Sequence, residues 1–429
     1  MLRLSLALVC LVAVVPRARA EAIFHPTAQM TPATLSEVVR AHSAKSSAAQ
    51  LTVDLALAEA VGARVFGNPI VDFTWGTIPL GEPNPKDLAS PLANIPNYNV
   101  GVSYTFDFLR RPPRVRRADA LVRASRAERE VILLEETWSL AKALGKIAVS
   151  ALKRRASLEM RVDADRATEI ARIRGKAGAG SLLDVDRMEN ERLRTELQVT
   201  AADAELEAAR ADCAAILGLA CADFATPDDA EAFLHAWTDA ALARTGSIEE
   251  RADLQSLSAQ VDAASAELGM AKRLAIPDVT VRLGYTRDQF VVSGNQQNSL
   301  NVGIALPLPV LSRGQAERRA ATARAHWLAD QRERLVRQSL ALIPAQRRSL
   351  ALGQERLRRL VGEMIPRARA VLASLQKASE SRLLPITDVL QASRTLNEML
   401  LDLAATEATS FETAVELLAQ FPIARSDTP

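Results

Sequence analysis

The sequence predicts a mainly α-helical fold with a smaller β contribution, in which one structural unit occurs twice. Ala, Leu, Arg and Glu dominate the chain, and aromatic residues make up only 4% of it, which favours long helices over a large mixed core. After Pro113 there is no proline and a single glycine, Gly145, up to Arg174, so one helix can run through this stretch. Two segments around an Asn-Val-Gly tripeptide, 98–108 and 300–310, alternate apolar with small or polar residues, as half-buried strands do.

The second half of the chain repeats the first. Three segments recur in the same order about 200 residues later, at offsets that differ by a few residues, as loop insertions would produce. The matched pairs are 69–76 with 277–284, 99–101 with 301–303, and 184–185 with 388–389. Each half is therefore expected to follow the order helix, strand, strand, long helix, long helix.

Five segments follow from this duplication. We expect a signal peptide at 1–20, a first structural repeat at 21–222, an inter-repeat segment outside the regular helices at 223–246, a second structural repeat at 247–421 and a C-terminal tail at 422–429. The expected strands lie at about 69–78, 98–108, 277–287 and 300–310. The long helices are expected at about 113–174, 183–217, 314–379 and 386–420.

The first 20 residues have the features of a secretory signal peptide. Arg3 precedes an apolar run at 4–15, and Ala18-Arg19-Ala20 supplies the small residues of a cleavage site. Cleavage is expected after Ala20, so that Glu21 begins the mature chain. Cys10 raises the alternative of a lipoprotein signal, but the residues before it form a poor lipobox.

Composition argues against catalysis and against nucleic acid. The chain has 53 basic and 51 acidic residues, so no overall charge favours nucleic acid as a partner. No nucleophile motif, phosphate-binding loop or HExxH motif is present, and the four histidines have no ligand spacing. We therefore expect no enzyme activity, no cofactor and no metal site.

Cys213 and Cys221 either pair across a helix end in an oxidising periplasm or are two small buried residues.

The alternating segments suit strands that cross an outer membrane with lipid on one face and water on the other. The residues expected to face lipid are Tyr98, Val100, Val102, Tyr104, Phe106, Val302 and Ile304. Those expected to face the water-filled lumen are Asn99, Ser103, Thr105 and Asn301. The alternative is a half-buried strand of a soluble sandwich. Four strands are too few for a closed barrel of about eight or more, so the membrane interpretation requires several copies to pool their strands.

Together, the signal peptide, the duplicated unit and the strand pattern resemble the TolC-like outer-membrane factors. The most specific local features are the two Asn-Val-Gly strands, the Pro-Val-Leu-Ser-Arg-Gly-Gln stretch at 309–315 and the Leu-Pro-Ile-Thr-Asp-Val-Leu run at 384–390. The resemblance covers about residues 35–420. It implies a trimer in which four transmembrane β-strands per subunit form one β-barrel, continued by coiled-coil-like helices that form an α-barrel across the periplasm.

The resemblance also implies a function and partners. Members of this family are exit ducts of tripartite efflux pumps, which export small molecules such as drugs or metal ions, or of type I protein secretion systems. The implied partners are two further copies of the chain, a periplasmic adaptor (membrane fusion) protein, a proton-driven inner-membrane transporter and outer-membrane lipid. The implied location is the outer membrane, with the helical part in the periplasm. A soluble periplasmic coiled-coil adaptor is the alternative outside this family.

In this family, acidic residues near the second helical turn close the periplasmic tip of the duct. Asp388 matches the first acidic position, whereas Gln391 stands at the second, and Arg382 lies near the family's arginine but is offset. Asp184 and Asp186 occupy the corresponding turn of the first repeat. Three copies of Asp388 would form a ring of like charge that binds cations or tunes gating. The alternative is an acidic residue favoured by the dipole at a helix N-terminus.

Basic residues cluster after each strand pair. They are Arg110, Arg111, Arg114, Arg116 and Arg117 in the first repeat, and Arg313, Arg318, Arg319 and Arg324 in the second. One interpretation is a collar that faces lipid phosphates or sets the charge of the lumen. The other is a solvated start of a long helix.

Overall fold

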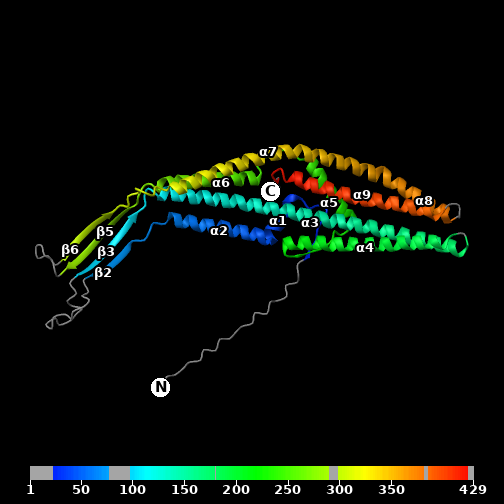
Figure 1. Cartoon of the computed structure of the whole chain (residues 1–429), viewed down its shortest axis with the longest axis horizontal. Helices are drawn as coiled ribbons and strands as arrows, with labels where there is room; N and C mark the ends of the chain where they lie inside the picture. Colours follow the sequence, from blue (N-terminus) through cyan, green and yellow to red (C-terminus); the bar gives the residue numbers. More distant parts are fainter. Residues whose placement is uncertain (1–22, 77–96, 179, 289–297, 381–384, 424–429) are drawn as a thin grey trace, which may run out of the picture. The chain divides into compact units, whose positions relative to one another are not determined.

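A computed structural model describes residues 23–76, 97–178, 180–288, 298–380 and 385–423 of the chain (Figure 1). The expected signal peptide, most of both loops between the paired strands, and Arg382 lie outside these residues. The chain divides into two compact units, one made of residues 1–46, 135–246 and 343–429, and the other of residues 47–134 and 247–342. We call them the helical unit and the sheet unit. Each unit draws on both repeats.

In the sheet unit, four strands form one antiparallel sheet (Figure 1). They are β2 (Ile70–Gly76), β3 (Asn97–Phe106), β5 (Val279–Asp288) and β6 (Asn298–Ala305). The sheet order is β2-β3-β5-β6, so the two strand pairs meet along β3 and β5, with Gly101 opposite Gly284. Among the described residues, the outer edges of β2 and β6 have no neighbouring strand.

Two expected strands end earlier than predicted. The strand expected to reach residue 310 stops at Ala305, and the one expected to reach residue 108 stops at Phe106. Pro307 and Pro309 explain the first difference, because proline has no N–H to donate to a neighbouring strand. The apolar pattern continues beyond the point where the backbone can pair.

Small residues pack the helices of the sheet unit. These helices are α2 (Ala44–Arg64), α6 (Ala252–Arg273), the first part of α3 (Arg111–Lys176) and the first part of α7 (Gln315–Arg359). Ala56, Ala60 and Ala63 of α2 pack on Ala118 and Val122 of α3. Alanine side chains let the helix backbones approach closely, which accounts for the alanine-rich composition of this unit.

The helical unit contains the remaining helices and a short second sheet. The helices are α1 (Pro32–His42), α4 (Leu182–Leu217), α5 (Pro227–Ala243), the π-helical turn η1 (Leu360–Met364), α8 (Ile365–Glu380), α9 (Ile386–Leu418) and the remaining parts of α3 and α7. One core cluster joins α3, α4, α8 and α9 through residues that include Met160, Met188, Leu372 and Val389. Strand β1 (Ile23–Phe24) pairs in parallel with β4 (Ala220–Cys221).

A disulfide closes the end of α4. Cys213 and Cys221 are bonded, with 6.1 Å between their Cα atoms. Gly218 ends the helix at φ 67°, a left-handed conformation that glycine adopts without steric cost and that turns the chain back toward Cys213. The structure thus selects the paired alternative for these cysteines. The bond also ties β4, and through it the pairing with β1, to the end of α4.

The inter-repeat segment forms a helix, so the prediction that it lies outside the regular helices was wrong. Thr226 caps α5, since its side chain accepts a hydrogen bond from the Asp229 N–H, and Pro227 occupies the first helical position. The rings of Phe233 and Trp237 on α5 lie 5.5 and 5.9 Å from the ring of Phe411 on α9. This helix is therefore part of the core of the helical unit.

The first long helix of repeat two, formed by α7, η1 and α8, is continuous but changes type near a proline. Pro344 lies inside α7, and Pro366 follows the π-helical turn η1. Proline cannot donate to the carbonyl four residues before it, and a single π-helical turn absorbs the mismatch. Among the described residues, no helix combines the length and the apolar character needed to cross a bilayer.

Candidate functional site

One face of the four-stranded sheet is apolar and exposed. Residues that lie opposite each other in the register, such as Val71, Val102, Leu283 and Val302, carry this character across all four strands. The exposed fraction is 46% for Val102, 52% for Leu283 and 70% for Val302. The face consists of Val71, Phe73 and Trp75, then Tyr98, Val100, Val102, Tyr104 and Phe106, then Val279, Val281, Leu283 and Tyr285, and finally Leu300, Val302 and Ile304. A contiguous apolar surface of this kind marks an interaction with an apolar partner or medium.

The opposite face carries a connected polar network. Arg282 of β5 pairs with Asp72 of β2 across the intervening strand and donates to Asn99 Oδ1 over 2.8 Å. Thr286 Oγ1 accepts from Asn99 Nδ2 at 2.5 Å and from Asn301 Nδ2 at 2.7 Å. Side chains from four strands thus bond to one another within a single copy. Ser103 and Thr105 lie on this same face.

Glycine in the Asn-Val-Gly motif makes room for this network. A Cβ on Gly101 would lie 2.9 Å from both Arg282 Nε and Asp72 Oδ1, closer than van der Waals contact allows. The motif therefore has three separate roles in β3: Asn99 bonds across the polar face, Val100 belongs to the apolar face, and Gly101 leaves space for the ion pair. Sequence reasoning did not single out Asp72 and Arg282, although both stand at polar positions of the predicted strands.

Arginines at the start of α3 bond to the ends of other helices. Arg111 and Arg114 donate to carbonyl groups of residues 63–65, where α2 ends, and Arg110 donates to the Ile276 carbonyl over 2.9 Å, just beyond α6. The last carbonyls of a helix lack partners within the helix and carry partial negative charge. Arg111 and Arg114 therefore cap the end of α2, and Arg110 bonds to the segment that follows α6, roles that neither interpretation of the basic cluster included.

The turn of the first repeat is stabilised by local contacts. Ser181 and Asp184 form a capping box at the start of α4, and Arg187 lies 3.5 Å from the Asp184 carboxylate. These contacts account for an acidic residue at this position. Asp186 is exposed.

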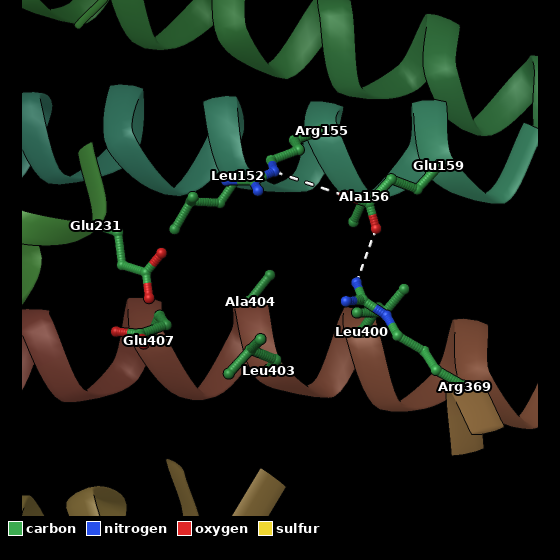
Figure 2. A pocket seen from close by; sticks show the side chains of 10 residues that line it. All are labelled: Leu152, Arg155, Ala156, Glu159, Glu231, Arg369, Leu400, Leu403, Ala404 and Glu407. Carbon is green, nitrogen blue, oxygen red and sulfur yellow. Dashed lines mark hydrogen bonds and ion pairs between the residues drawn. The ribbon is translucent and has the colours of Figure 1, made fainter. Parts of the chain in front are cut away.

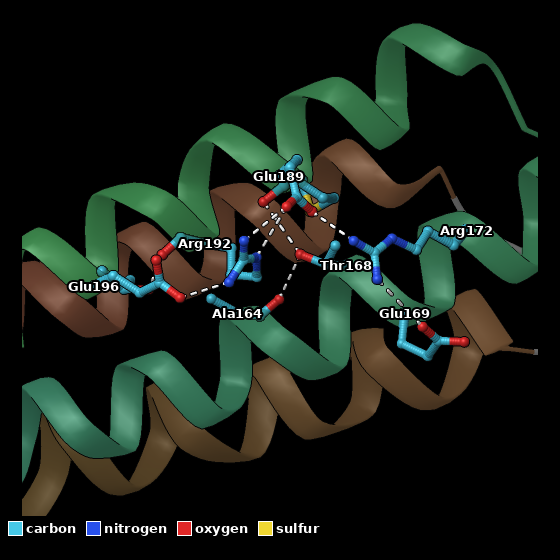
Figure 3. Close-up of polar contacts among 9 residues, drawn as sticks. Ala164, Thr168, Glu169, Arg172, Glu189, Arg192 and Glu196 are labelled. Carbon is cyan, nitrogen blue, oxygen red and sulfur yellow. Dashed lines mark hydrogen bonds and ion pairs between the residues drawn. The ribbon is translucent and has the colours of Figure 1, made fainter.

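Side-chain contacts join α3 and α4 close to this turn (Figure 3). Glu189 receives Arg172 at 3.0 Å and Arg192 at 2.8 Å, and hydrogen bonding to Arg192 holds the pKa of Glu189 below its ordinary value. The buried Thr168 hydroxyl lies 3.2 Å from the Met188 carbonyl. Figure 3 shows these groups between the two helices, so the hairpin is held by charged contacts as well as by its apolar core.

The corresponding acidic residue of the second repeat is free of such contacts in the described part of the chain. Asp388 stands in the first turn of α9, and the Pro385 cap provides no side-chain hydrogen bond. Ile386 and Val389 are buried in the core, whereas Asp388 and Gln391 are exposed. Asp388 and Gln391 therefore share an outward face of α9. Among the described residues, no three His, Cys, Asp or Glu side chains gather as a metal site.

The fold is that of known outer-membrane channels. The outer membrane protein VceC from Vibrio cholerae superimposes with a TM-score of 0.69 at 19% identity, over 90% of this chain and 94% of that one. The Campylobacter jejuni CmeC outer membrane channel gives 0.70 at 11% identity, over 94% and 89%. The open state of the Neisseria gonorrhoeae MtrE outer membrane channel gives 0.67 at 13% identity, over 91% and 88%. No family model and no curated protein sequence matches the chain. These likenesses confirm the predicted fold class.

Proposed function

We propose that this chain, which has the fold of outer-membrane channels, is the outer-membrane exit duct of a tripartite efflux pump. The observation that carries the proposal is the two-sided sheet. Its apolar face is exposed across all four strands, while its polar face is bonded internally through Arg282, Asp72, Asn99 and Thr286. A wall between hydrocarbon and water needs this distribution. The apolar residues would face lipid and the polar network would line the lumen, as the sequence predicted.

The sheet edges support assembly as a trimer. In the described structure β2 and β6 each pair along one edge only, and backbone N–H and C=O groups left unpaired in hydrocarbon cost several kcal/mol each. Joining β2 of one copy to β6 of the next would satisfy both edges. Three copies would supply twelve strands, above the minimum of about eight for a closed barrel.

A duct in the outer membrane requires partners that supply energy. We propose a periplasmic adaptor and a proton-driven inner-membrane transporter, on the strength of the family resemblance and the channel fold. The cargo would be small molecules such as drugs or metal ions. Export of a protein by a type I secretion system is the second candidate. A soluble periplasmic adaptor would leave the apolar face of the sheet without a partner, which disfavours it.

Asp388 is the best candidate for the periplasmic gate. It is exposed, lacks a side-chain hydrogen bond at the helix start, and shares a face of α9 with Gln391. Three copies around a common axis would bring three carboxylates together, and like charges at close range favour a bound cation. Asp184 and Asp186 are weaker candidates, because the capping box already accounts for Asp184.

Cell fractionation tests the proposal. The full chain should enter the outer-membrane fraction and run as a heat-sensitive trimer on a gel, and a variant without residues 69–108 should do neither. Recovery of that variant in the outer membrane would refute the role of the sheet. A deletion strain tested against drugs and metal salts, with protein secretion assayed in parallel, then distinguishes the two transport roles.

A further inference from the structure

A cleft of about 170 Å³ lies within the helical unit, among α3, α5, α8 and α9 (Figure 2). Its long wall is apolar. Figure 2 shows the carboxyl groups of Glu231 and Glu407 near one another at one end, and Glu159 and Arg369 at the other. The apolar wall is formed by Leu152, Ala156, Leu400, Leu403 and Ala404. An apolar cavity of about 150 Å³ is enough to hold benzene, so a ring of six carbons fits this space.

The positive charges of the cleft are already neutralised. Arg369 contacts the Glu159 carboxylate at 2.8 Å. Arg155 contacts Asp228 at 2.9 Å and Glu159 at 3.5 Å. Neither guanidinium group needs a further anion, and two arginines are matched by two carboxylates. An anionic ligand would therefore find no unpaired partner at that end.

Glu407 is the group with a carboxyl oxygen that lacks a hydrogen bond. Its side chain is only 4% exposed, and its Oε2 atom is buried without a hydrogen bond. His235 Nε2 lies 3.8 Å from Glu407 and 3.6 Å from Glu231, too far for a hydrogen bond to either carboxylate. A buried carboxyl oxygen without a donor is costly. The geometry thus calls for a donor at this end of the cleft.

We propose that the cleft binds a small organic ammonium ion, with its N–H groups on Glu407 and Glu231 and its hydrocarbon part against the leucine and alanine wall. Calcium or magnesium fits less well, because each prefers six or more oxygen ligands, and the described residues bring no three metal-binding side chains together here. The site lies wholly in the helical unit and does not depend on the proposed duct function.

Titration calorimetry on the detergent-solubilised full chain tests the site. The probe is cyclohexylammonium, and cyclohexanol is its neutral counterpart. The wild type should bind the ammonium ion, and cyclohexanol should bind at least about tenfold more weakly, since a hydrogen bond to a charged group is worth about 1.5–3 kcal/mol. The Glu407→Gln variant should lose a similar factor for the ammonium ion. Glu412→Gln, which changes an exposed carboxylate on the same helix, should bind as the wild type does.

Proton release provides a second readout. Burial raises the pKa of Glu407 above its ordinary value, with a smaller contribution from Glu231, while His235 opposes the shift. An ammonium ion favours the ionised carboxylate, so binding should release protons, and the heat should depend on the ionisation enthalpy of the buffer. Equal binding by wild type and Glu407→Gln, equal binding of cyclohexanol, or no binding to a wild type with native helical content would each overturn the proposal and leave the cleft to water.

Discussion

Lysine substitutions at Val102 and at its neighbour Ser103 test which medium each face of the sheet contacts. Both residues stand in the middle of β3, so their backbone surroundings are nearly the same. Val102 lies between Val71 and Leu283 on the apolar face. Ser103 lies opposite Arg282 on the polar face. The two substitutions therefore differ mainly in the medium that the new charge meets.

The expected magnitudes differ clearly. A lysine on the lipid face near the bilayer midplane costs about 2–4 kcal/mol, which is a factor of roughly 30 or more in the insertion equilibrium for each chain. In a trimer the cost recurs three times. A lysine at position 103 meets water and the like charge of Arg282, where repulsion at about 4 Å amounts to about 1 kcal/mol in water. Because this repulsion reduces the difference in cost between the two lysine variants, the comparison is conservative.

The assay is the amount of heat-sensitive trimer in the outer-membrane fraction at matched expression. We expect strong depletion for Val102→Lys and near-normal amounts for Ser103→Lys. Equal amounts for both variants, or greater loss for Ser103→Lys, would refute the assignment of lipid to the apolar face. If the sheet belonged to a soluble sandwich, Val102 would also be buried. In that case the Ser103→Lys variant would be absent from the membrane fraction.

Three further predictions follow from the packing and charge of individual residues. A Cβ on Gly145 would overlap the Phe411 ring, while Gly269 has open space around it. In chemical denaturation, Gly145→Ala should lower the free energy of unfolding by about 1–3 kcal/mol, and Gly269→Ala should raise it by up to about 1 kcal/mol. The raised pKa of Glu407 makes its folding contribution most favourable at low pH and less so as pH rises through that pKa. The unfolding midpoint of Glu407→Gln relative to wild type should therefore increase with pH in amine-free buffer, and a constant difference would contradict the burial argument. In planar bilayers, Asp388→Asn should weaken block of the channel by divalent cations several-fold, and unchanged block would remove Asp388 from the gate.

Local patterns predicted those parts of the fold that depend on local chemistry. The alternation in 98–108 places side chains on faces because a strand has a period of two, and it needs no knowledge of neighbours. The end of β6 at Ala305 also depends on local chemistry, since Pro307 and Pro309 cannot donate, but the expected strand was extended to residue 310. The helix α5 could also have been predicted, because Thr226 and Pro227 form a helix start. That prediction was wrong because a short, acidic segment was expected to be irregular.

Contacts between distant residues were beyond the sequence. The Arg282 and Asp72 pair joins residues from different repeats across an intervening strand. The cleft around Glu407 likewise needs α3, α5, α8 and α9 in place, and nothing near Glu407 in the sequence sets it apart from other helical glutamates. The arginines after the first strand pair illustrate the same limit, because their acceptors are the ends of helices distant in sequence.

The two faces of the sheet also bear on the order of assembly. The polar side chains bond to one another within one copy, so in the proposed duct this face needs no neighbouring copy to complete its hydrogen bonds. In the proposed duct the apolar face would contact lipid, and the outer edges of β2 and β6 would need strands that the described part of one copy does not provide. A single copy entering hydrocarbon would carry unpaired N–H and C=O groups at several kcal/mol each. We therefore expect strand pairing between copies to precede or accompany insertion, so that a variant unable to trimerise should accumulate outside the membrane rather than as an inserted monomer.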